Sequence, residues 1–196
     1  MKADKNAKTQ EKMLYRSVFT ALMAAIVFVT TMFFKIPIPT PVGQTMLKVG
    51  NVFCLLSGML LGPVFGGLAA GIGSALYDLT DPAFTASAPF TLVFFFIMGF
   101  VCGVITSPRG TYRAPSFLRT AVGAAAGAFS YFLLYAVKSV AVLILAGSTL
   151  PAAIIACSTK LLVSLTNATL ATVVSVLLAK PLLGALERNG LLNKLR

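Results

Sequence analysis

An uncharged stretch between Lys48 and Asp78 (residues 49–77) is the feature that most constrains this chain. It is too long for one membrane-spanning helix, because about 20 apolar residues already cross a hydrocarbon core roughly 30 Å thick. Its middle holds Gly62-Pro63, a dipeptide that interrupts helices. The stretch therefore predicts two short antiparallel helices, over residues 46–61 and 64–79, that neighbouring helices must shield.

Composition assigns the chain to the membrane. Hydrophobic residues make up 58% of the sequence, charged residues only 11%, and the mean hydropathy is +0.91, whereas a soluble domain carries about 25% charged residues. Further uncharged stretches approach the length of a helical span: 17–34, 82–108, 120–137, 139–159 and 161–179. The sequence predicts an all-α integral membrane protein with a single domain over residues 1–196.

Basic residues predict the topology, because Lys and Arg accumulate on the cytoplasmic side of a membrane. They cluster in residues 2–16, 109–119 and 180–196. The first two clusters share a side only if an even number of spans separates them. Splitting the central stretch at Gly62-Pro63 gives four. Two more helices, over 117–146 and 151–179, complete six transmembrane helices with both termini cytoplasmic. In this scheme residues 1–16 form a basic N-terminus, 17–184 the bundle and 185–196 a cytoplasmic tail.

Chemical groups that the chain lacks narrow the function. It contains no His, and its three Cys all lie in apolar runs, so we expect neither a metal site nor a cofactor. It has no phosphate-binding loop for ATP hydrolysis and no carboxylate pair for an ion relay within the spans. No basic segment is interleaved with aromatic residues, which disfavours nucleic-acid binding. We expect no enzymatic activity, and contact with membrane lipid follows from the basic clusters.

The last two predicted helices carry matching polar faces. Tyr131, Tyr135 and Lys138 follow i, i+4, i+7 spacing, and Lys160, Ser164 and Asn167 repeat it on the next helix. The helices are antiparallel about a tip near Thr149. Lys138 and Lys160 each lie 11 residues from that tip (149 − 138 and 160 − 149), and the other two pairs also match to within one residue. This pattern predicts a polar pocket opening outward. The alternative is that both lysines extend to the membrane interface.

Other residues could complete such a pocket. Two neighbouring ammonium groups need an anion, which Asp78 or a carboxylate or phosphate of a ligand could supply. Asn51 is either a pocket residue or the cap of a helix start. Phe94, within the Phe-rich stretch 90–96, could stack on a ring, or it could face lipid or the core. The Pro-rich connection 35–48 has the composition of an ordered cover rather than a flexible linker.

Small residues four apart let helices approach closely. We expect most of these pairs to pack within the chain and leave Ala21 and Ala25 open as a contact with another subunit. The pairs expected to pack internally are Gly58/Gly62, Gly67/Gly71, Ala69/Gly73, Gly99/Gly103 and Gly123/Gly127.

The sequence resembles the S components of energy-coupling factor (ECF) vitamin transporters over nearly its whole length. The resemblance rests on the basic N-terminus, the six helices, Ala21-x-x-x-Ala25, Lys48-Val-Gly-Asn51, and the block from Leu60-Leu-Gly-Pro-Val-Phe-Gly-Gly to Ser74-Ala-Leu-Tyr-Asp78. It implies a multi-pass substrate-binding subunit of a bacterial cytoplasmic membrane, working with a transmembrane coupling subunit and two cytoplasmic ATPases. It also implies capture of a small-molecule vitamin or precursor from outside, under the loop that joins the first two helices.

By the same resemblance, Ala21 and Ala25 meet the coupling subunit, and the site lies in the outer halves of the last three helices. The substrate stays open among pyridine or pyrimidine vitamin precursors, pantothenate, riboflavin and queuine-like bases. The alternative function is a standalone facilitator or a structural membrane protein that binds lipid headgroups.

Overall fold

The computed structural model describes residues 2–107 and 115–191. In these ranges the chain is 82% helical and forms six α-helices, one β-hairpin and a short 3-10 turn. The elements are α1 (Lys2–Phe33), β1 (Lys35–Thr40), β2 (Gly43–Lys48), α2 (Gly50–Leu61), α3 (Pro63–Thr80), η1 (Thr85–Ser87), α4 (Ala88–Thr106), α5 (Phe117–Leu145) and α6 (Leu150–Arg188).

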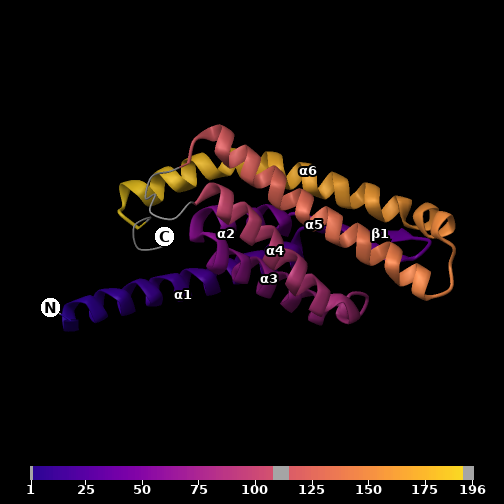
Figure 1. Ribbon diagram of the computed structural model, residues 1–196, viewed down its shortest axis with the longest axis horizontal. Helices are drawn as coiled ribbons and strands as arrows, with labels where there is room; N and C mark the ends of the chain where they lie inside the picture. Colours follow the sequence, from indigo (N-terminus) through magenta and orange to yellow (C-terminus); the bar gives the residue numbers. More distant parts are fainter. Residues whose placement is uncertain (1, 108–114, 192–196) are drawn as a thin grey trace.

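The helices form an elongated bundle. The start of α1 and the end of α6 lie at one end, and the β-hairpin lies at the other (Figure 1). Within the described chain, four helical segments are long and apolar enough to cross a membrane: Thr9–Phe33, Thr85–Thr106, Phe117–Leu145 and Leu150–Arg188. The remaining helices, α2 and α3, are shorter and mostly buried. A count of six crossings with cytoplasmic termini stays a prediction.

The predicted break in the central apolar stretch is confirmed. Gly62 separates α2 from α3 with a φ of 79°, a left-handed value that favours glycine, and Pro63 occupies the first position of α3. The predicted start of the first short helix at residue 46 is wrong, because residues 43–48 pair with β1 as a strand and α2 begins only at Gly50.

The connection between α1 and α2 is an antiparallel hairpin with Lys35 opposite Lys48 and Thr40 opposite Gly43. Gly43, at the end of the tight turn, has a φ of 91°. Pro37 and Pro39 lie in β1, an edge strand, where a missing N–H costs no ladder bond. The expectation of an ordered connection is therefore met, by a hairpin that the sequence analysis did not predict.

Glycines set the close packing of α2, α3 and α4, as the small-residue pairs predicted. A Cβ on Gly58 would lie 2.4 Å from the carbonyl oxygen of Gly99, and one on Gly71 would lie 2.6 Å from that of Leu92. Gly73 packs in the same way on Ala24 of α1. These helices approach each other backbone to backbone.

Two outer helices extend beyond their predicted limits. α1 begins at Lys2 rather than near residue 17, because the basic N-terminus is rich in Ala, Lys, Gln and Glu, which favour helix. α6 continues past residue 179 through Pro181 to Arg188. All three cysteines are free and buried, as expected of small core side chains.

Candidate functional site

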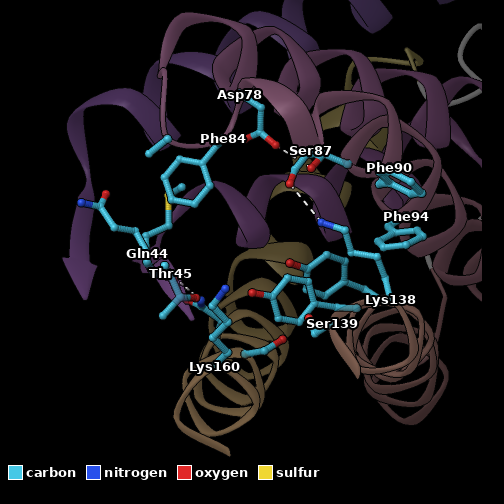
Figure 2. A pocket seen from close by; sticks show the side chains of 18 of the residues that line it. Gln44, Thr45, Asp78, Phe84, Ser87, Phe90, Phe94, Lys138, Ser139 and Lys160 are labelled. Atoms are coloured by element: carbon cyan, nitrogen blue, oxygen red, sulfur yellow. Dashed lines mark hydrogen bonds between the residues drawn. The ribbon is translucent and has the colours of Figure 1, made fainter. Parts of the chain in front are cut away.

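A cavity of about 230 Å³ lies between the β-hairpin, the η1–α4 segment and the facing sides of α5 and α6 (Figure 2). The hairpin contributes residues 42–46 and Lys48, and the η1–α4 side contributes Ser87 and several aromatic rings. The cavity is therefore formed at the hairpin end of the bundle by segments far apart in the sequence.

Eight of the nine residues predicted from the sequence line this cavity. They are Asp78, Phe94, Tyr131, Tyr135, Lys138, Lys160, Ser164 and Asn167. Asn51 does not line it: its side chain is buried in the first turn of α2, with both amide atoms unpartnered among the described residues. In the structure Asn51 therefore lies outside the lining of the cavity. Among the residues described at the start of α2, its side chain also forms no capping hydrogen bond.

The matching polar faces of α5 and α6 meet at the cavity. Lys138 Nζ donates a hydrogen bond to Ser87 Oγ at 3.0 Å, and Lys160 Nζ donates one to the Val42 carbonyl of the hairpin turn. Figure 2 shows both lysine side chains at the cavity. Both amines therefore bond to groups that line the cavity.

Asn167 connects α6 to the hairpin. Its Oδ1 accepts a hydrogen bond from the Lys48 backbone N–H at 3.0 Å, and its Nδ2 donates to the Met46 carbonyl at 2.7 Å. The Lys48 N–H and the Met46 carbonyl alternate along β2 with the groups that pair it to β1. The Asn167 side-chain amide therefore bonds to the free edge of β2 in the way that a neighbouring strand would. Asn167 and Met46 are both buried, so the hydrogen bond between them is largely shielded from bulk solvent.

A buried carboxylate and a third lysine lie deeper along the hairpin side. Asp78 is 3% exposed and accepts a hydrogen bond from Thr91 Oγ1. Lys48 Nζ lies 4.4 Å from the centre of the Phe95 ring, a cation–π contact. Burial lowers the pKa of Lys48, and the nearby Asp78 carboxylate partly opposes that shift.

Aromatic rings form one wall of the cavity. The Phe95 and Tyr131 ring centres are 4.5 Å apart, and Tyr131 stacks on Tyr135 with centres 5.9 Å apart. Phe90 and Phe94 form a second pair with centres 6.2 Å apart. Flat apolar faces beside ammonium groups suit a planar ring with polar or charged substituents.

A second attachment of the hairpin lies outside the cavity. Lys35 Nζ lies 2.9 Å from Asp81 Oδ2 and also donates to Tyr77 Oη, while Tyr77 donates to the same Asp81 oxygen at 2.7 Å. Hydrogen bonds to Tyr77 and Asp81 raise the pKa of Lys35. Hydrogen bonds from Lys35 and, secondly, from Tyr77 lower the pKa of Asp81.

Several cavity residues, contributed by the hairpin and the α3–α4 connection, were not predicted as site residues. Thr45, Met46 and Lys48 lie in the connection that was interpreted as an ordered cover, whose end overlapped a helix expected to begin at residue 46. Ser87 follows a connection without a periodic pattern. Pro41-Val42-Gly43 was the available signal for a hairpin, because a glycine closing a Pro-containing turn is typical of one.

Ala21 and Ala25 lie on the exposed side of α1, while Ala24 and Val27 on the same helix face the core. Small exposed residues leave a flat surface on which another helix can pack closely. A contact with a partner subunit at Ala21 and Ala25 stays a prediction.

Two solved structures share this fold. The S component for biotin from an ECF-type ABC transporter aligns with a TM-score of 0.64 at 16% sequence identity, covering 87% of this chain and 91% of that one. The S component of a bacterial ECF transporter aligns with a TM-score of 0.59 at 21% identity, covering 87% and 96%. Among curated proteins, an uncharacterized protein in a gap 3′ region from Pyrococcus woesei is 38% identical over 86 residues. That match spans 44% of this chain and 55% of the relative.

The family model for the ECF-type riboflavin transporter, S component, matches residues 12–184. Proteins of this family are multi-pass membrane subunits that bind substrate for vitamin uptake, and they pair with an energy-coupling module rather than act as enzymes. The matched residues include every helix of the bundle and all of the hairpin. The chain therefore belongs to the family of ECF-type riboflavin transporter S components.

Proposed function

We propose that this chain captures a small water-soluble vitamin, vitamin precursor or nucleobase-like compound from outside the cell, for uptake driven by ATP hydrolysis in partner subunits. The proposal names the eight cavity-lining residues predicted from the sequence as the substrate site, with the β-hairpin as its outer cover. Asn51 is left out of the site, because it does not line the cavity.

The observation that carries this proposal is the composition of the cavity wall. Ammonium, carboxylate, hydroxyl and amide groups converge there on stacked aromatic rings, within about 230 Å³. Ligand pockets are concave and mostly apolar, with a few placed polar groups that fix orientation. This cavity lies below the range of roughly 300–1,000 Å³ typical of such pockets, which favours a compact substrate.

The hairpin is the proposed route of entry to the site. The hairpin contacts Asn167 and Lys160 of α6. Its residue Lys35 also contacts Tyr77 of α3 and Asp81, which directly follows α3. In this proposal the hairpin admits substrate by breaking these hydrogen bonds and the Lys35–Asp81 ion pair.

The energising partners are proposed as one transmembrane coupling subunit and two cytoplasmic ATPases. The exposed positions Ala21 and Ala25 on α1 support a docking surface for the coupling subunit. A helix of that subunit can approach α1 closely there, because neither alanine extends beyond its Cβ.

The experiment is uptake of radiolabelled candidate vitamins by bacterial cells that lack their own uptake routes. Cells expressing this chain with an ECF coupling module are compared with cells expressing it alone. The proposal predicts concentrative uptake only with the module, and loss of uptake when Ala25 is replaced by Trp. Equal uptake without the module would instead support a standalone facilitator.

A further inference from the structure

The cavity holds more positive than negative charge. Among its lining residues are three lysines, Lys48, Lys138 and Lys160, and a single carboxylate, Asp78. With every group charged, the excess is two positive charges (three minus one). A cavity of one sign attracts ligands of the opposite sign.

Asp78 is already engaged by other groups. It accepts a hydrogen bond from Thr91, and among the lysines it interacts most strongly with Lys48. Lys48 is further stabilised by the face of the Phe95 ring. Asp78 also interacts with Lys138, but less than with Lys48, and a single carboxylate can balance only one of the three lysines.

In the part of the chain that the structure describes, the hydrogen-bond acceptors of Lys138 and Lys160 are uncharged. These are the Ser87 hydroxyl and the Val42 carbonyl, and among the described residues no carboxylate lies within 4.0 Å of either ammonium group. The two lysines project from facing helices and repel each other. Two half-buried like charges that face one cavity are stabilised when an anion binds between them.

A second group in the cavity also lacks a partner. The Ser164 hydroxyl is buried on α6, one turn from Lys160, and has no hydrogen-bond partner among the described residues. A buried hydroxyl without a partner costs free energy that a bound ligand recovers. On the facing helix α5, the stacked rings of Tyr131 and Tyr135 line the same cavity and offer a flat apolar surface.

We infer that the substrate is an anion with a planar ring, and that its carboxylate or phosphate binds between Lys138 and Lys160 while its ring lies against Tyr131 and Tyr135. This inference rests on the proposed function and adds the charge class of the substrate. Neutral vitamins with the same ring lack the group that the two lysines require.

The test uses matched ligands that share a planar ring and differ in whether they carry an anionic group, measured by isothermal titration calorimetry on the detergent-solubilised full chain. The pairs are nicotinate with nicotinamide and riboflavin 5′-phosphate with riboflavin. The first pair tests a carboxylate and the second tests a phosphate. A wider panel of water-soluble vitamins and nucleobases is titrated in the same buffer.

We expect the tightest ligand to be an anion that binds at least tenfold more tightly than its neutral counterpart. Lys138→Gln should weaken that anion by roughly 10- to 100-fold, because a charge-assisted hydrogen bond is lost, and should change the neutral counterpart less than threefold. Lys138→Arg should restore most of the affinity, which separates loss of charge from loss of fold. The matched control is Lys180→Gln, which removes an exposed charge from α6 away from the cavity.

A neutral tightest ligand, or equal weakening of both members of a pair in Lys138→Gln, would overturn the inference and leave the proposed function standing. If no compound of the panel binds the folded protein, the proposed function fails and the inference fails with it.

Discussion

Replacing Asn167 with alanine tests whether the hairpin is fixed to the bundle by the contacts described above. The substitution removes two hydrogen bonds, one from the Lys48 N–H at 3.0 Å and one to the Met46 carbonyl at 2.7 Å. At about 1 kcal/mol net for each bond, hairpin docking weakens by about 2 kcal/mol. Since 1.4 kcal/mol corresponds to a factor of ten, the open population rises about 30-fold.

Hydrogen–deuterium exchange of the β2 amides measures this opening directly. In Asn167→Ala, we expect exchange in residues 43–48 to accelerate about 30-fold while exchange in the α2 and α4 cores stays unchanged. Ser164→Ala is the matched control: it removes a buried polar group one turn away on the same face of α6, and its hydroxyl has no partner among the described residues. Equal exchange in the two variants, or an unchanged rate in Asn167→Ala, would refute the reasoning.

Three further predictions concern packing, partner contact and pH. Gly58→Ala places a Cβ 2.4 Å from an α4 carbonyl oxygen and should lower Tm, because overpacking destabilises the fold by about 1–3 kcal/mol, more than the gain in helix propensity. Gly184→Ala is the control: no described atom lies within 4 Å of its added Cβ, so Tm should not fall. Ala25→Trp should abolish uptake with the coupling module yet leave ligand affinity within threefold, and a parallel loss of affinity would contradict docking at this surface. The lowered pKa of Asp81 and the raised pKa of Lys35 stabilise the folded state above the ordinary Asp pKa and below the ordinary Lys pKa. The Tm difference between wild type and Asp81→Asn should therefore be constant from about pH 5 to pH 9 and shrink on acidification through the lowered pKa of Asp81; a difference that grows on acidification would contradict this sign.

Helix pairing was predictable from the sequence because its determinants are local or periodic. Gly62-Pro63 cannot continue a helix, so the division of the central stretch follows from two residues. The polar faces of α5 and α6 could be matched because antiparallel helices joined by a short tip align residues equally distant from it. Lys138 and Lys160 indeed face one cavity.

The hairpin side of the cavity was not predictable to the same degree. Strand pairing in residues 35–48 depends on tertiary contacts such as Asn167 with β2, which no local pattern reveals. The predicted helix began at residue 46, while the hairpin register takes Met46 and Lys48 into a strand. A polar residue at a helix start, such as Asn51, does not by itself indicate which side of that helix a cavity occupies.

The most direct test of the central claim is a thermal-shift screen of the purified chain, without partner subunits, against water-soluble vitamins, their precursors and nucleobases. Ligand at a thousandfold excess over its Kd stabilises the folded state by about 4 kcal/mol. The account predicts one strong stabilising ligand. At the same ligand concentration its effect falls to about 1.4–2.7 kcal/mol in Lys138→Gln, as a 10- to 100-fold weaker Kd requires, and it also falls in Asn167→Ala. A folded protein that no compound stabilises, or a ligand whose effect is unchanged in both variants, would contradict it.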